Sequence, residues 1–241
     1  MKKKKLLILL CSVFLMLVGC SVFLISFFNL PSDPPPVIYP LQHNLQQIEI
    51  NFKKTELILC PDTATYIELI GYRESEYFIS EENGKLIVSD ESEKIKLSGV
   101  GKYLQESFTL SAEKKIIFHI SPEYQENNFS LVVKNSTLTI SAPLTQLTLY
   151  AENSSIFAEN MIFERFHGNI KNSTTVLSIS HPDIDFSRHI ETHNAQFLLN
   201  GDERANTVHY ESYTKQNDLT LDVIGGICTI SFPTYQIENK E

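Results

Sequence analysis

The sequence is short of basic residues and of the motifs that mark common enzymes. Beyond residue 30 it has 16 lysines and arginines against 29 aspartates and glutamates, a balance of −13, and the whole chain has no tryptophan and only nine glycines. Such an acidic body is a poor candidate for binding nucleic acid or anionic lipid through charge. The sequence also has no Gly-rich phosphate loop, no nucleophile elbow and no zinc-type cluster of Cys and His. We therefore expect no nucleic-acid partner and no cofactor.

Cysteines are too few for a disulfide framework. Two of the four, Cys11 and Cys20, lie in an apolar N-terminal run, which leaves Cys60 and Cys228 in the rest of the chain. Both occur in apolar strand contexts, so buried thiols are the favoured interpretation, with a single disulfide between them as the alternative.

The first thirty residues are typical of a membrane anchor. Lys2 to Lys5 precede an uncharged run over 6–30, which as a helix would reach about 37 Å and so cross a hydrocarbon core of about 30 Å. The positive-inside rule then predicts a single-pass membrane protein with a cytoplasmic N-terminus and an extracytoplasmic body. Two alternatives stay open: a cleaved signal peptide, and a lipoprotein anchored at Cys20, because Leu17-Val18-Gly19-Cys20 is similar to a lipobox.

The segments that follow the predicted anchor over 1–30 are short and distinct. A Pro-rich segment over 31–45 favours extended polyproline II geometry and is interpreted as a stalk. The body is predicted over 46–235, followed by a polar tail over 236–241. Its first part, 46–122, has alternating or apolar runs that predict strands, with an Asn83-Gly84 hairpin turn. These strands are Ile48–Phe52, Glu56–Cys60, Tyr66–Tyr72, Tyr77–Ser80, Leu86–Ser89, Ser107–Leu110 and Ile116–Ile120.

The stretch over 129–223 repeats one short unit, centred on Asn135, Asn153, Asn172 and Asn194. The spacings between these asparagines are 18, 19 and 22 residues. Mostly apolar residues lie four and two positions before each asparagine and three and five positions after it. The inward-facing positions therefore change from even to odd spacing across the asparagine, so the chain must turn there. A weaker fifth copy is placed at Gln216-Asn217-Asp218, and Gly225-Gly226 would end the run before a closing strand over 227–232.

This periodicity predicts an all-β fold: a single-stranded, right-handed-type β-solenoid of stacked coils, preceded by one transmembrane helix. The four repeated asparagines are predicted to form a structural turn ladder, because asparagine tolerates left-handed backbone geometry and its amide can bond to neighbouring coils. Three of them also begin Asn-x-Ser/Thr sequons, which a eukaryotic secretory pathway could glycosylate.

Histidines suggest a surface site. His167 and His189 both lie five residues before a repeated asparagine, so the register predicts them on adjacent coils, about 4.8 Å apart and facing outward. Glu191 and His193 would share that face and could complete a divalent metal site, but ordinary exposed polar residues are the favoured interpretation, so no metal site is predicted. Together with Tyr150, these three histidines are the predicted binding residues.

Acidic pairs offer little support for catalysis. Asp183 and Asp185 lie two apart and Asp202-Glu203 follows later, but nothing repeats them at one coil spacing. A glycosidase requires two carboxyls at a defined separation, one with a raised pKa. We therefore predict no catalytic residue.

Five segments share a pattern with one known family: Tyr77–Val88, Ile116–Pro122, Lys134-Asn135-Ser136, Glu152-Asn153-Ser154 and Lys171-Asn172-Ser173. Through them the chain resembles the bacterial "putative adhesin" domain family, a family of unknown function often found on membrane-anchored envelope proteins of Gram-positive bacteria. The resemblance covers most of 48–232. It implies surface adhesion and supplies no catalytic residues.

The functional prediction is a membrane-anchored, extracytoplasmic, non-catalytic module for binding, adhesion or structure in the cell envelope. Its expected partners are the membrane, through the N-terminal helix, and an envelope polymer or partner membrane protein. An accessory sensor or regulator of envelope stress is the alternative, and a polysaccharide-acting enzyme ranks third.

Overall fold

The computed structural model describes residues 12, 14–21, 34–41, 45–90, 113–181, 186–204, 215 and 217–233. The chain divides into two compact units, Met1–Asp33 and Pro34–Glu241. In the first unit, residues 12 and 14–21 are helical. Cys20 is exposed and carries a free thiol.

The prediction of a membrane-spanning helix is contradicted by the structure. Within the described part of the chain, no helix combines the length and the apolar character that crossing a membrane requires. The predicted single-pass membrane localisation, which was inferred from this helix, is contradicted for the same reason. The rest of the apolar run over 6–30 lies outside the described residues.

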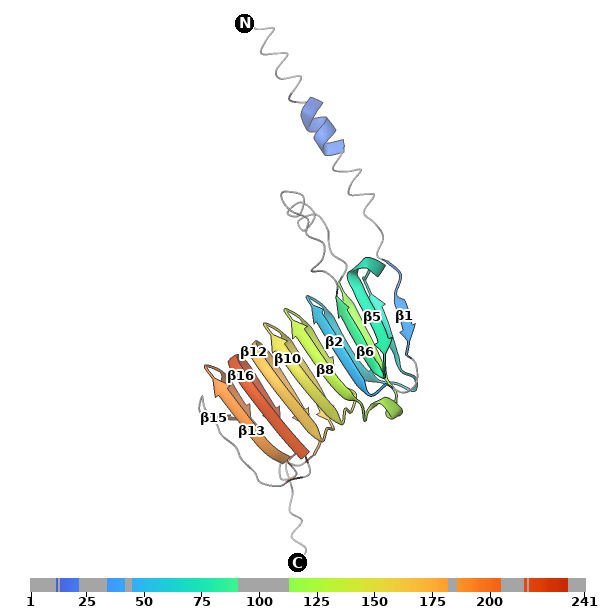
Figure 1. Cartoon of the computed structure of the whole chain (residues 1–241). Coiled ribbons are helices and arrows are strands. Elements are labelled where there is room, and N and C mark those ends of the chain that lie inside the picture. The colour runs from blue at the N-terminus through green and yellow to red at the C-terminus, as the bar shows by residue number, and fades with distance from the viewer. Residues whose placement is uncertain are drawn as a thin grey trace, which may run out of the picture. The chain divides into compact units, whose positions relative to one another are not determined.

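The second unit consists almost entirely of strands (Figure 1). Most of the predicted strands are present, and Asn83 and Gly84 (φ 54° and 75°) form the predicted hairpin turn, which joins β5 (Tyr77–Glu82) to β6 (Lys85–Asp90). The strand predicted at 107–110 and the tail at 236–241 lie outside the described residues. Within the segment predicted as a stalk, residues 37–40 form a strand. The strands are β1 (Val37–Pro40), β2 (Gln47–Lys53), β3 (Glu56–Pro61), β4 (Tyr66–Ile70), β5 (Tyr77–Glu82), β6 (Lys85–Asp90), β7 (Lys115–Ile120), β8 (Asn128–Lys134), β9 (Thr137–Ile140), β10 (Gln146–Glu152), β11 (Ser155–Met161), β12 (Arg165–Ile179), β13 (Phe186–His193), β14 (Gln196–Leu199), β15 (Asp202–Arg204) and β16 (Asn217–Ser231), with short 3-10 helices η1 (Glu74–Glu76) and η2 (Pro122–Tyr124).

All sixteen strands belong to one mixed sheet that curls like a half-barrel, and the predicted solenoid of stacked coils is therefore wrong. Three features overturn it. The long strands β12 and β16 pair with each other along almost their whole length, so the sheet continues past the point where separate coils were expected to turn. Antiparallel pairs occur at β1–β4, β4–β7, β5–β6 and β14–β15. Finally, the strands are not stacked in chain order, because β16 lies between β12 and β13 and β2 lies beside β8.

The curl divides the sheet into two limbs. The first limb contains β5, β6, β2, β8, β10, the first half of β12, the first half of β16, and β13. The second limb contains β1, β4, β7, β3, β9, β11, the second halves of β12 and β16, β14 and β15. Figure 1 shows β2, β8, β10, β12, β16 and β13 of the first limb side by side.

The core lies between the two limbs, and alternate residues of each strand point into it. Leu131 and Leu149 on the first limb and Leu138 and Ile140 on the second are at most 1% exposed. These are inward positions that the repeat register predicts. Full burial of such a side chain contributes about 1.5–3 kcal/mol, so the apolar alternation itself holds the limbs together.

The sheet bends along one row of left-handed residues. Asn135, Asn153, Asn172 and Asn194 have φ between 47° and 52°. Asparagine adopts this conformation at lower cost than most residues because its short side chain can hydrogen-bond locally. On β16 the bend lies at Gly225 and Gly226 (φ 66° and 81°), not at the weaker repeat around Asn217, which only begins the strand. The fifth repeat was therefore placed wrongly, and the predicted closing strand is the second half of β16.

Serine hydroxyls link the strands along this bend. The backbone N–H of Thr55 donates to Ser136 Oγ (3.2 Å), that of Ser136 to Ser154 Oγ (3.2 Å), and that of Ser154 to Ser173 Oγ (3.0 Å). Each serine hydroxyl in turn donates to the carbonyl two residues before it, at 2.7–2.8 Å. This serine ladder satisfies backbone groups that the bend removes from ordinary strand pairing.

Candidate functional site

The predicted binding residues lie on the outer face of the first limb, where successive strands align side chains in rows. One row runs through Ser130, Thr148, His167, Thr220 and His189. The row beside it runs through Val132, Tyr150, Asn169, Asp222 and Glu191. These residues come from β8, β10, β12, β16 and β13, so five neighbouring strands build one polar surface, which we call the polar face.

Tyr150 supplies an aromatic ring to the polar face. Its ring lies between two ammonium groups, with Lys134 Nζ 5.3 Å and Lys171 Nζ 5.5 Å from the ring centroid. Its hydroxyl donates to Glu152 Oε2 (3.4 Å), and that carboxylate also pairs with Lys134 (3.2 Å). These cation–π contacts and the ion pair hold a half-buried ring in place on the surface.

The structure does not bring His167 and His189 onto adjacent strands. Each is aligned with Thr220 of β16, which lies between them, so their strands are two strand spacings apart, roughly 9–10 Å. His167 donates from Nε2 to Asp218 Oδ2 (3.0 Å), and both side chains are about half exposed. The predicted spacing of 4.8 Å is wrong because the register assumed that coils follow one another in chain order.

His189 and His193 do share one carboxylate. His189 Nε2 lies 3.2 Å from Glu191 Oε1, and His193 Nε2 lies 3.8 Å from Glu191 Oε2. Beside them, Asn169 Nδ2 donates to Asp222 Oδ2 (3.1 Å). The remaining oxygens, Asn169 Oδ1 and Asp222 Oδ1, are buried and accept no hydrogen bond from the described residues. The polar face therefore pairs its histidines with acids, and two buried oxygens lie beneath its surface.

The residues considered for metal binding and for catalysis are only partly covered by the structure. Among the residues that the structure describes, no group of three or more His, Cys, Asp or Glu side chains could hold a metal ion. The acids considered for catalysis, Asp183 and Asp185, lie outside the described residues. Asp202 and Glu203 are exposed on the short edge strand β15.

A second cluster of polar side chains was not predicted from the sequence. His119 Nδ1 donates to Asp62 Oδ2 (2.9 Å) and lies 3.7 Å from Cys60 Sγ, while Tyr66 stacks on the His119 ring at 4.0 Å. Cys60 and Cys228 are both free, so the disulfide alternative is not formed. Burial, then the charge of Asp62, raises the pKa of the Cys60 thiol, which disfavours a reactive thiolate. The pairing of β7 with both β3 and β4 brings these residues together, so nothing local in the sequence could have shown the cluster.

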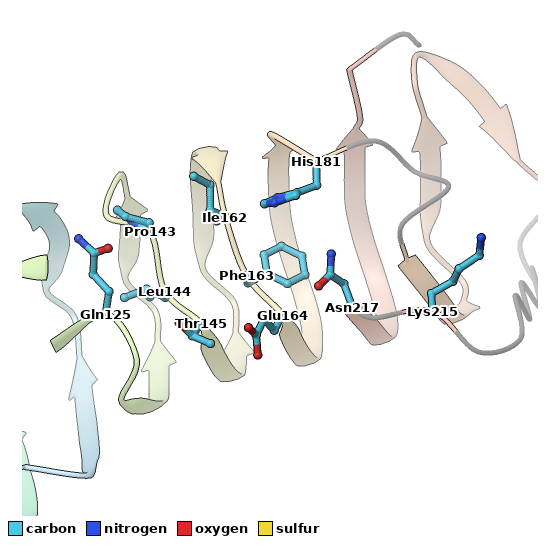
Figure 2. Close-up of a pocket in the computed structure, with 10 residues that line it drawn as sticks. All are labelled: Gln125, Pro143, Leu144, Thr145, Ile162, Phe163, Glu164, His181, Lys215 and Asn217. Carbon is cyan, nitrogen blue, oxygen red and sulfur yellow. The ribbon is translucent and has the colours of Figure 1, made fainter. Parts of the chain in front are cut away.

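A cavity of about 460 Å³ opens along the segments that connect the strands. Figure 2 shows its lining residues extending across several connections, from Gln125 at one end to Lys215 at the other. Apolar side chains, among them Leu144 and Phe163, line it together with His181. His181 Nδ1 is buried and without a hydrogen-bond partner among the described residues. No sequence motif marks this cavity, because each connecting segment contributes only one to three residues.

Comparisons with known proteins show a shared fold. No family model and no curated protein matches the chain. A solved structure of a putative cell adhesion protein from Clostridium sporogenes ATCC 15579 has a TM-score of 0.55 at 12% identity and covers 83% of this chain and 100% of that one. A putative adhesin from Bacteroides fragilis NCTC 9343 (TM-score 0.41, 11% identity) covers 84% and 99%, and a putative lipid binding protein from Parabacteroides distasonis ATCC 8503 (TM-score 0.36, 8% identity) covers 83% and 97%. At 12% identity, the likeness to the C. sporogenes structure shows a shared fold alone. The chain is thus similar in fold to a protein named for cell adhesion.

Proposed function

We propose that this chain is a non-catalytic binding module whose polar face holds an extended cell-surface polymer or a partner protein. The observation that carries the proposal is the setting of Tyr150, an aromatic ring fixed between two lysines on the second of the five strands that build the polar face. Side chains that follow one another at about 4.8 Å along each row suit recognition of an extended ligand through many weak contacts. The adhesion role in the name of the C. sporogenes protein agrees with this proposal.

The charges of the polar face favour a neutral or basic ligand. Lys134 is paired with Glu152, and the imidazoles of His167 and His189 are paired with Asp218 and Glu191. An anionic polymer would meet these carboxylates on a chain whose net charge is −9. The hydroxyls of a neutral glycan could instead donate to the partly exposed carboxylates of Asp218 and Glu191, while one of its sugars contacts the exposed edge of the Tyr150 ring.

The test is a binding assay with the triple variant Tyr150→Ala, His167→Ala, His189→Ala. Wild-type protein should co-sediment with insoluble cell-wall glycan, or bind members of a neutral glycan array, and the triple variant should bind at least about tenfold more weakly, the loss of roughly 1.4 kcal/mol. A matched triple variant, Glu159→Ala, Thr174→Ala, Gln196→Ala, removes exposed side chains from the second limb and should bind like wild type. Circular dichroism checks that all three proteins are folded.

Two results would overturn the proposal. Equal binding by wild type and the Tyr150 triple variant would show that the polar face is not the binding surface. Release of new reducing ends from the glycan by the purified protein would show an enzyme instead of a binding module.

A further inference from the structure

The outer face of the second limb differs sharply from the polar face. One row crosses the ten strands there, and its residues are aligned one to one by the strand pairing. In spatial order the row is Ile38, Glu68, Ile117, Ile58, Thr139, Phe157, Val176, Thr229, Leu198 and Glu203. We call its first nine residues, Ile38 to Leu198 in this order, the apolar row. Only Glu68 among these nine carries a charge, and six of the nine side chains are aliphatic or aromatic, while the exposed Glu203 of β15 ends the row.

The apolar row is open on the described part of the chain. Ile38 is 64% exposed, Phe157 42% and Val176 36%. A single exposed apolar side chain is ordinary, whereas a contiguous series of them marks an interaction surface. The corresponding row on the first limb, with Thr148, His167, Thr220 and His189, is polar. The outer face of the second limb therefore has an apolar row beside more polar ones, which the outer face of the first limb lacks.

The order of residues in the apolar row is nearly symmetric about Thr139. One strand away on either side are Ile58 and Phe157, and two strands away are Ile117 and Val176. Three strands away both sides are polar, with Glu68 and Thr229, and four strands away both are apolar again, with Ile38 and Leu198. A two-fold axis parallel to the strands at Thr139 would place apolar residues on apolar ones and the carboxylate of Glu68 on the hydroxyl of Thr229. Such self-complementarity is what an isologous dimer requires.

Charge and area agree with that arrangement. Part of the charge near the apolar row is balanced within the chain: Lys115 Nζ lies 3.2 Å from Glu56 Oε2, and the His119 ring lies beside Glu68, with Nε2 3.9 Å from Oε2. A two-fold axis at Thr139 would place Glu68 of one copy opposite Thr229 of the other, so the carboxylate within the apolar row would not meet its own counterpart. Nine strands at about 4.8 Å, each with about four to six residues at about 3.3 Å, span roughly 40 Å by 13–20 Å. That is about 500–800 Å² per copy, which reaches the size of a standard stable interface at its upper end.

We infer that the apolar row is a dimer interface, on which the second limb of one copy packs face to face against the second limb of another. Two sheets pack in this way about 10 Å apart with interdigitating side chains, as in a β-sandwich. The polar faces then point away from each other on the two outer surfaces. The dimer would present two copies of the proposed binding surface, so a polymer could be bound with avidity.

Analytical ultracentrifugation of the full chain tests the inference by comparing wild type with variants that add one charge to the apolar row. Wild-type protein should be dimeric at micromolar concentration. Val176→Glu and Phe157→Glu should each raise the dimer dissociation constant by roughly thirtyfold or more, as expected at an interface hot spot. Thr148→Glu, which adds the same charge at an exposed position of the polar face, should leave the dimer intact. Monomeric wild-type protein at every concentration tested would overturn the inference and leave the row to a different protein partner.

Cross-linking provides a second measurement that does not disturb the apolar side chains. Thr139→Cys places a thiol at the proposed axis, so a short bis-maleimide should join two copies with high yield. Thr148→Cys and wild type, which share the native cysteines, give the background. Equal yields in all three proteins would contradict a two-fold axis at Thr139 even if a dimer is found.

Discussion

The backbone N–H of Ser136 donates to the Oγ of Ser154, 3.2 Å away on the neighbouring strand segment of the bend. The Ser154 hydroxyl completes the link by donating to Glu152 O at 2.8 Å. Both serines are buried, so neither group has water as a substitute partner. One hydroxyl thus joins two strands at the point where the sheet bends.

Ser154→Ala should destabilise the protein through this link. The substitution leaves the buried N–H of Ser136 without an acceptor, which costs about 1–3 kcal/mol, and the loss should appear in urea unfolding. Ser155→Ala, one residue further along β11 and half-buried on its outer side, is the matched control and should change stability much less. Similar losses in both variants would contradict the serine ladder.

Leu149→Asp should prevent folding, whereas Thr148→Asp should be tolerated. Leu149 is 1% exposed and points between the limbs, where an unpaired carboxylate is very costly, while Thr148 is exposed on the polar face. Circular dichroism and soluble yield are sufficient measurements. A folded Leu149→Asp protein would mean that the inward register of β10 is wrong.

Gly226→Ala should be far more damaging than Gly201→Ala, although both glycines have positive φ. A Cβ at Gly226 (φ 81°) would lie 2.2 Å from Ser173 O and 2.7 Å from Ser173 N, so backbone would have to move. At Gly201 (φ 84°) no atom lies within 4 Å of the added Cβ. Thermal or urea unfolding should show a loss of about 1–2 kcal/mol at Gly201 from backbone strain alone, and roughly 3 kcal/mol or more at Gly226. Equal losses would show that β12 and β16 are not in close contact at the bend.

Asp62 should make part of the stability dependent on acid pH. The backbone N–H of Thr63 and then the imidazole of His119 hold the pKa of the Asp62 carboxyl below its ordinary value. Because the folded-state pKa is the lower one, this stabilisation is complete above the unfolded-state pKa of about 3.9 and is lost as pH falls through the folded-state pKa. Asp62→Asn should therefore have a lower urea midpoint than wild type at pH 7, and the gap should close as pH falls below about 4.

The control for this pH series is Glu159→Gln, which removes an exposed carboxylate from β11. A gap between wild type and Asp62→Asn that stays constant from pH 7 to pH 3 would show that the carboxylate does not gain stabilisation from these partners.

The sequence by itself determined the local structure of this protein. Alternation of apolar residues placed Leu131, Leu149 and Ile140 in the core, because side-chain direction along a strand depends only on position within it. The asparagines at the bend and the Asn83-Gly84 hairpin were also predictable, since left-handed geometry is a property of the residue itself. These features need no knowledge of distant parts of the chain.

Only the tertiary structure decided which strands are neighbours. Thr220 of β16 separates His167 from His189, and Cys60 meets His119, because backbone hydrogen bonds form between segments far apart in the sequence. Any strand with the right apolar alternation can fill such a place, so sequence periodicity gives no strand order. For the same reason the curled single sheet and the apolar row, which combines residues of nine strands, became visible only once the pairing was known.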